Sequence, residues 1–185
     1  RVIAKKYFRN ITSPEIKKLV ISKYHEFRMC GLIILVYQYE TFPELRKQIY
    51  DFFMKHTKYI NNWDLVDVTI PKTVGAYLID KDRSVLYELT KSNYLWDRRI
   101  AVLATFPFIK QNDFKDCLAI SESLLKDKED LMHKAVGWML REIGKKDEAV
   151  LTKFLDTHIK EMPRTMLRYA IEKFPEKKRK EYLKK

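Results

Sequence analysis

Glycine, proline and cysteine are scarce in this chain. It has four glycines and six prolines among 185 residues, and so few turn-forming residues favour a mostly helical protein. No segment alternates apolar and polar residues over the length of a strand, so no β-sheet is predicted. The longest apolar run, GLIILVY at residues 31–37, is too short to cross a bilayer.

The two cysteines, Cys30 and Cys117, both stand in apolar contexts. Neither is part of a CxxC pair, and no histidine lies near either at the spacing of a zinc site. We therefore expect two small buried thiols in a reducing cytosol. No triad or metal-site spacing involves the histidines, to which we assign no chemistry: His25, His56, His133 and His158.

Acidic residues are also fewer than basic ones. The chain has 37 Lys and Arg residues against 25 Asp and Glu, a net charge of +12. This excess indicates a polyanionic partner, with nucleic acid favoured over membrane. A basic surface that is merely solvated is the alternative. We expect a cytoplasmic protein associated with the nucleoid, and residues that precede Arg1, because the chain does not begin with Met.

Apolar residues recur at helical spacing nearly everywhere. Ser13 is predicted to cap one helix and Thr41 another, and Gly144 is predicted to end a third. The join at residues 25–27 contains no turn-forming residue. We expect that residues are absent there, the alternative being one long helix.

The predicted helices follow one another in pairs about 35–45 residues apart, which is the range of HEAT-type repeats. The sequence therefore predicts an all-α protein of HEAT-like helical repeats, an α-α superhelix or solenoid, as a single domain over residues 1–185. A helical bundle is the alternative. A stack of such pairs presents a concave binding surface.

Each of the three tryptophans adjoins charge or glycine in the sequence. Trp63 and Asp67 are four residues apart, so on a helix they share a face. Trp96 shares a face with Arg99, and Trp138 adjoins Gly137. Core packing explains each tryptophan taken alone, whereas the three together favour an aromatic-lined cleft.

Four stretches carry a family resemblance: NNWDLVDVTIP, LWDRRIAVLATF, HKAVGWMLREIGKKD and LRYAIEKF, at residues 61–71, 95–106, 133–147 and 167–174. In this order they resemble the AlkD-like DNA alkylation repair family, DNA glycosylases built of HEAT-like repeats. The resemblance covers residues 60–174 well. It implies excision of cationic alkylated purines, N3-methyladenine and N7-methylguanine, from duplex DNA, without deep base flipping and without a metal or other cofactor.

The resemblance also implies the residues of the site. Trp63, Asp67 and Trp138 match the positions that line the pocket beside the lesion, and Arg99 matches one that holds the DNA backbone. Asp67 would then stabilise the positive charge that develops on the sugar, or orient the attacking water. A salt bridge between Asp67 and an arginine such as Arg99 is the alternative.

Further basic residues are candidate DNA contacts. We expect Arg98 and Arg141 to contact phosphates, although Arg141 is equally suited to pairing with an acid of a neighbouring repeat. A lysine found in the cleft of some family members corresponds to Pro107 here, and Lys110 is a candidate substitute. The family's N-terminal helix, which supplies an aromatic, is not matched, and Tyr7 is given no such role.

Two other functions compete with that of a monomeric glycosylase. A HEAT-type scaffold that binds DNA or protein without catalysis would have no need to keep Asp67 together with Trp63 and Trp138. A helical repeat that reads RNA predicts a base-reading code in each repeat, and none is visible.

Overall fold

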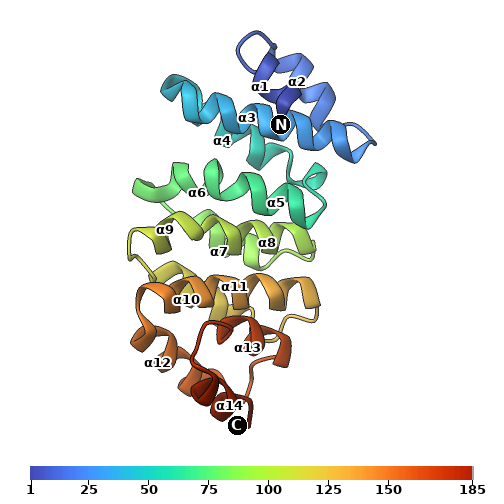
Figure 1. Ribbon diagram of the computed structural model, residues 1–185. Helices are drawn as coiled ribbons and strands as arrows, with labels where there is room; N and C mark the ends of the chain where they lie inside the picture. Colours follow the sequence, from blue (N-terminus) through green and yellow to red (C-terminus); the bar gives the residue numbers. More distant parts are fainter. Residues whose placement is uncertain (185) are drawn as a thin grey trace. The chain divides into compact units, whose positions relative to one another are not determined.

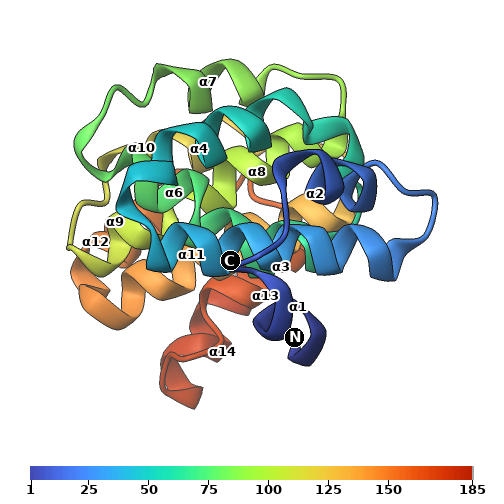
Figure 2. The ribbon, with the colours of Figure 1, turned by 90° about the horizontal axis from the view of Figure 1, so that it is seen from above.

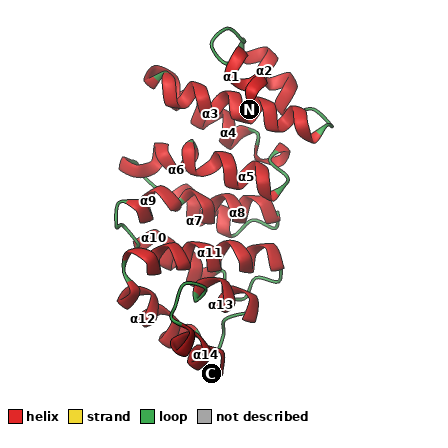
Figure 3. Ribbon diagram, viewed as in Figure 1, coloured by secondary structure: helices red, strands yellow, loops and turns green. Residues whose placement is uncertain are grey.

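The computed structural model describes residues 1–184, so the last residue of the predicted domain lies outside the description. Helices joined by short loops account for these residues, and no β-strand occurs among them (Figures 1 and 3). The predicted all-α fold of paired helices is thus confirmed. Two compact units make up the chain, one from Arg1 to Asp82 and one that begins at Arg83.

The first unit is organised around one central helix, α3, on which α1, α2, α4 and α5 pack. Its middle residues, 31–36, are all buried, as expected for a segment that is apolar on most sides. Figure 2 shows this long helix from above. The helices of the unit are α1 (Val2–Tyr7), α2 (Ser13–Val20), α3 (His25–Thr41), α4 (Arg46–Lys55), α5 (Trp63–Thr69) and α6 (Val74–Tyr77).

Two predicted helix caps in this unit are wrong by one or more residues. Thr12, not Ser13, precedes α2, and its N–H and hydroxyl both donate to the Glu15 carboxylate, at 2.8 and 2.6 Å. The Thr12 side chain in turn faces the backbone N–H of Glu15, and the two residues together make a capping box. Thr41 is the last residue of α3, and a short 3₁₀ turn at Pro43–Leu45 leads into α4. Proline at the start of that turn suits its missing N–H.

The join before α3 is a turn at residues 21–24, so the alternative of one long helix is wrong, and the expectation that residues are absent there stays a prediction. Ser22 Oγ accepts the backbone N–H of Tyr24 at 3.2 Å. Arg28, one turn into α3, donates to the carbonyl oxygens of Ser22 and Lys23, each at 3.0 Å. Side chains therefore satisfy the backbone groups of this turn, which needs no glycine or proline.

The same turn recurs twice in the second unit. Ser92 Oγ accepts the N–H of the residue two positions later at 3.1 Å, and Arg98 donates to the Ser92 carbonyl at 2.9 Å. In the next copy the Asp127 carboxylate accepts the N–H two positions later at 2.9 Å, and His133 Nε2 donates to the Asp127 carbonyl at 2.6 Å. These two copies begin 35 residues apart, which supports the repeat interpretation.

In the second unit, α11 is the central helix and packs against α8, α9, α10, α12 and α13. The single helix that apolar spacing favours over residues 94–110 is interrupted at Thr105, because Pro107 has no N–H to continue the ladder. The helices are α7 (Ser84–Thr90), α8 (Leu95–Ala104), α9 (Phe106–Lys110), α10 (Lys115–Ser123), α11 (Asp130–Lys146), α12 (Glu148–His158), α13 (Arg164–Ala170) and α14 (Glu176–Lys184).

Gly144 does not end α11, contrary to the prediction. It lies inside the helix, where a Cβ atom would stand 2.4 Å from Leu151 Cδ2 of α12. A Cβ on Gly137 would stand 2.5 Å from the Met166 carbonyl oxygen of α13. Both glycines therefore permit close packing of the next helices on α11. None of the helices within residues 1–184 is long and apolar enough to cross a membrane.

Candidate functional site

The first candidate element is α5, which carries Trp63 and Asp67. The helix begins at Trp63 and ends at Thr69, before Pro71, as the sequence predicted. Its buried residues are Leu65, Val66 and Thr69. Trp63 is 53% exposed and Asp67 is half-buried, and at a spacing of four they lie one turn apart on a helix. A large apolar side chain exposed next to a carboxylate is typical of a binding surface rather than of a core.

The start of α5 is tied to the start of α3. His25 Nε2 lies 2.8 Å from Asp64 Oδ2, and both side chains are about one-third exposed or less. Asp64 thus anchors the first turn of the helix that carries Trp63. No sequence signal pointed to His25, because its partner stands 39 residues away.

Beside this anchor the surface is aromatic. Tyr24 and Phe27 are 54% and 51% exposed, and their rings meet edge to face with centroids 5.5 Å apart. The ammonium of Lys23 lies 5.1 Å from the Tyr24 ring centroid, a cation–π contact. Exposed aromatic side chains interleaved with cations suit nucleic acid, because bases stack on aromatic rings and phosphates attract lysine.

In the second unit, Trp138 of α11 lies in a cluster of mixed character. Its ring centroid is 6.0 Å from that of Phe106 in α9, and Lys110 Nζ lies 4.6 Å from the Phe106 centroid. The indole N–H donates to Glu142 at 3.0 Å, and Lys145 binds the same carboxylate at 2.7 Å. Lys110 is exposed. Of the basic candidates it is the one with an exposed side chain.

Arg98 is bound within the second unit. Its Nε donates to Asp127 Oδ2 at 2.6 Å and Nη2 to Oδ1 at 3.3 Å. The side chains of this pair are 14% and 4% exposed. The guanidinium therefore joins the first turn of α8 to the turn before α11, and a DNA phosphate would have to displace Asp127 to receive it.

Arg99 is buried, with an exposed fraction of 4%. One guanidinium N–H donates to the backbone carbonyl oxygen of Leu131, at 2.5 Å, in the first turn of α11. Asp97, two residues before Arg99, accepts a hydrogen bond from the Ser92 hydroxyl at 2.8 Å. These contacts hold the start of α8 in place.

Arg141 pairs with Glu172, which follows α13 in the sequence. This is the ion pair between repeats that the sequence allowed as an alternative to a phosphate contact. Burial alone would raise the pKa of Glu172, but a hydrogen bond from Lys173 and the charge of Arg141 hold that pKa below its ordinary value. Glu172 therefore stays ionised at neutral pH and keeps Arg141 occupied.

Ion pairs with glutamates neutralise some of the surface lysines. Lys178 Nζ binds Glu148 at 2.7 Å and joins α14 to α12, and Lys145 binds Glu142.

Cys117 is buried, as predicted, and burial raises the pKa of its thiol to about 11. Cys30 is half-buried.

Comparison with known families and proteins identifies the family of the chain. The family model described as DNA alkylation repair enzyme matches residues 1–174. A comparison with curated proteins found no match. Since the match extends over nearly the whole chain and agrees with the residue motifs around Trp63 and Trp138, the chain belongs to the DNA alkylation repair enzyme family.

Proposed function

We propose that this protein is a DNA glycosylase that hydrolyses the N-glycosidic bond of cationic alkylated purines, such as N3-methyladenine and N7-methylguanine, in duplex DNA. One structural observation carries the proposal. On α5, the half-exposed indole of Trp63 lies one turn from the Asp67 carboxylate, in a chain with a net charge of +12. Membership of the DNA alkylation repair enzyme family supports a role in repair.

Cleavage of this N-glycosidic bond needs no strong general acid. Alkylation leaves a positively charged purine, which is a good leaving group and does not need to be protonated. The remaining barrier is the positive charge that develops on the deoxyribose as the bond breaks. A fixed carboxylate such as that of Asp67 stabilises this charge, and electrostatic terms of this kind are often the largest in catalysis. Asp67 is also suited to orienting the attacking water.

The aromatic residues then supply surface rather than proton transfer. Trp63 would pack against the deoxyribose and favour the cation through its π face. Trp138, supported by Phe106, is proposed for the same kind of contact. Because the base would remain outside a deep pocket, no narrow base-shaped cavity is required by this mechanism.

We propose different roles for the basic candidates. Lys110 is exposed and is proposed to attract phosphates. Arg98 and Arg141, held in ion pairs, are proposed to keep the helix starts in register. Arg99 remains a proposed site residue. Because Arg99 is only 4% exposed, we propose that it mainly holds the start of α8 on the first turn of α11.

Release of methylated bases tests the proposal. DNA treated with a methylating agent is incubated with the wild type, with Asp67→Asn and with Asp80→Asn, a matched control at an exposed acid of the same unit. We expect wild type and control to release N3-methyladenine and N7-methylguanine alike. Asp67→Asn should lose about a hundredfold or more in single-turnover rate, as fixed electrostatic groups typically do, at unchanged DNA affinity.

A noncatalytic scaffold is the alternative. It predicts DNA binding without base release by any variant, or equal slow release by all three. Either outcome, with folding of each variant verified by circular dichroism, would remove the assignment of Asp67.

A further inference from the structure

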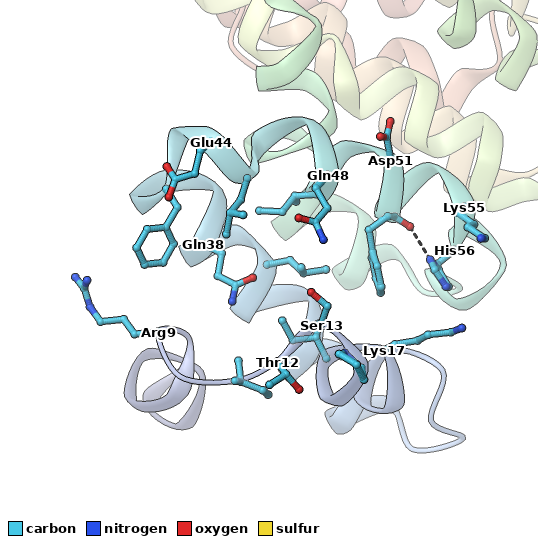
Figure 4. A pocket seen from close by; sticks show the side chains of 18 residues that line it. Arg9, Thr12, Ser13, Lys17, Gln38, Glu44, Gln48, Asp51, Lys55 and His56 are labelled. Carbon is cyan, nitrogen blue, oxygen red and sulfur yellow. Dashed lines mark hydrogen bonds between the residues drawn. The ribbon is translucent and has the colours of Figure 1, made fainter.

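A groove of about 830 Å³ opens in the first unit, on elements that the proposed repair chemistry does not use. Helices α2 and α4 form its walls, and α3 lies at its floor (Figure 4). Both α2 and α4 pack on α3. The groove therefore lies where two neighbouring helices rest on a common third one without closing over it.

The inside of the groove is mainly apolar. The apolar side chains that line it come from all three helices and from the turns beside them: Ile11, Pro14, Ile16, Leu35, Phe42, Leu45, Ile49 and Phe52. Of these, Leu45, Phe42 and Phe52 remain half-exposed. Apolar side chains left open along a groove of this size mark a binding surface.

Two polar side chains in the groove are more than nine-tenths buried. Gln38 donates through Nε2 to the Phe8 carbonyl oxygen at 2.9 Å, and its Oε1 accepts no hydrogen bond within residues 1–184. His56 donates through Nδ1 to the Phe52 carbonyl oxygen at 2.7 Å, and its ring stacks on Phe52 with centroids 4.1 Å apart. Gln38 Oε1 is not one of the fully buried polar atoms that lack a partner, so it is open both to water and to a donor that enters the groove.

The rim of the groove is positively charged at both ends. Figure 4 shows Arg9 at one end, and Lys17 and Lys55 toward the other. Arg9 is held over the rings of Phe8 and Phe42, at 5.0 and 5.8 Å. In the described part of the chain neither Lys17 nor Lys55 forms an ion pair.

The acids of the rim offset this charge at the Arg9 end only. Asp51 is bound by Lys47 at 2.6 Å, which leaves Glu44, beside Arg9, as the other acid of the lining. The end of the groove near Lys17 and Lys55 is therefore the more cationic one, and it calls for an acidic group on whatever binds there.

The length of the groove distinguishes between possible ligands. From Glu44 to His56 the wall formed by α4 and the residues at its two ends comprises thirteen residues, about 18 Å at the rise of a helix. Lys17 and Lys55 come from different walls, α2 and α4, so two acidic side chains of one helix match them better than the single charged head of an amphiphile. Duplex DNA would not fill an apolar groove, because its outer surface is a charged backbone.

We infer that this groove binds an amphipathic helix of a partner protein, with about three turns of apolar side chains against α3 and acidic residues near Lys17 and Lys55. Recognition of a helix by an apolar groove between helices is a common mode of peptide binding. Such a partner docks on α2 and α4 and leaves the exposed face of α5 accessible.

A fluorescein-labelled peptide of about twelve residues tests the inference against the full chain. It has leucines at the second, fifth, sixth and ninth positions and glutamates near its C-terminal end, and binding is followed by fluorescence anisotropy. We expect saturable binding in the micromolar range. Lys17→Glu combined with Lys55→Glu should weaken it about tenfold, since two favourable ion pairs become repulsive.

A charge-matched control separates the groove from the general positive charge. Lys18→Glu combined with Lys58→Glu changes the net charge equally at two exposed residues outside the groove, and it should leave binding within about twofold of the wild type. A second peptide with lysines in place of the glutamates should bind the Lys17→Glu/Lys55→Glu variant better than the wild type.

Methyl NMR spectra locate the bound peptide. We expect shifts at Ile16, Leu35 and Ile49, which line the groove. The inference is overturned if the peptide leaves these methyl signals unchanged, if dodecanoate shifts them and the peptide does not, or if a DNA duplex displaces the peptide. Base release is measured separately, so failure of the docking site would leave the proposed glycosylase intact, and the reverse.

Discussion

His25 and Asp64 join the first turns of two helices, with 2.8 Å between His25 Nε2 and Asp64 Oδ2. The contact links α3, the central helix of the first unit, to α5, the helix that carries Trp63 and Asp67. The direction of the Trp63 indole thus depends on a residue far away in the sequence.

Loss of this contact should affect both stability and activity. We expect His25→Ala to lower the free energy of unfolding by about 1–2 kcal/mol, because a half-buried hydrogen bond is lost and Asp64 is left without its partner. Urea unfolding followed by circular dichroism measures this. Base release should fall more than stability alone explains, at a temperature where the variant is fully folded.

A double-mutant cycle provides the control. His25→Ala and Asp64→Ala remove the same contact, so the double variant should be little worse than either single one. Fully additive losses would mean that the two side chains act separately and that the contact does not position α5.

Gly137 and Gly144 should respond differently to alanine. At Gly137 the new methyl group would meet a backbone oxygen, that of Met166, which cannot move without shifting α13. At Gly144 it would meet Leu151 Cδ2, the end of a flexible side chain. We expect Gly137→Ala to cost about 1–3 kcal/mol and Gly144→Ala less, since alanine also gains up to about 1 kcal/mol of helix propensity.

Thermal unfolding of the two variants side by side measures this difference. If Gly137→Ala were as stable as the wild type, α13 would have to pack on α11 more loosely than the structure shows. A Gly144→Ala variant less stable than Gly137→Ala would contradict the distinction between a rigid and a flexible neighbour.

The helical architecture was predictable because it depends on local signals. Apolar periodicity and the few turn-forming residues gave the all-α fold and the short α5 before Pro71. The turn before α3 was not recognised, because, like the turns before α8 and α11, it uses a serine or aspartate with a basic residue six positions later instead of glycine or proline. With that spacing known, Ser22 and Arg28 would have predicted the first turn.

The residues of the candidate site could be predicted only by type. The motifs pointed to Trp63 and Asp67, but periodicity does not say that Trp63 is exposed, nor that Arg99 is buried. The burial of Arg98 and Arg141 depends on Asp127 and Glu172, each about 30 residues away. Contacts at that separation are set by packing, which a single sequence does not reveal.

Tyr87 makes stability depend on pH in the alkaline range. Burial, followed by its hydrogen bond to Asp116, raises the pKa of Tyr87 to about 12 from an ordinary value near 10. The Tyr87 hydroxyl donates to Asp116 Oδ1 at 2.6 Å. Because the folded state keeps this proton longer than the unfolded state, the stabilising contribution is complete below pH 10 and declines as pH rises toward 12.

Urea unfolding at several pH values between 8 and 11 measures this contribution. We expect Tyr87→Phe to be less stable than the wild type at pH 8, with the difference between the two shrinking as pH rises. A constant difference over this range would show that Tyr87 ionises alike in the folded and unfolded states.

Lys110 and Arg98 are predicted to differ in what they do for the protein. Lys110 is exposed, so Lys110→Gln should leave the free energy of unfolding within about 0.5 kcal/mol of the wild type. If Lys110 contacts a phosphate, the variant should bind duplex DNA more weakly, and the slope of log affinity against log salt should fall by about one unit.

Arg98→Met should lower the free energy of unfolding and leave the salt dependence of DNA binding unchanged. It leaves the buried carboxylate of Asp127 without its cation, and breaking a buried pair in this way costs about 3–5 kcal/mol. At a temperature where the variant is folded, the salt slope of its DNA binding should equal that of the wild type, because Arg98 is held by Asp127 rather than by phosphate. Anisotropy with a labelled duplex at four salt concentrations separates the two cases. A lower slope for Arg98→Met, with an unchanged slope for Lys110→Gln, would show that Arg98 exchanges Asp127 for a phosphate when DNA binds.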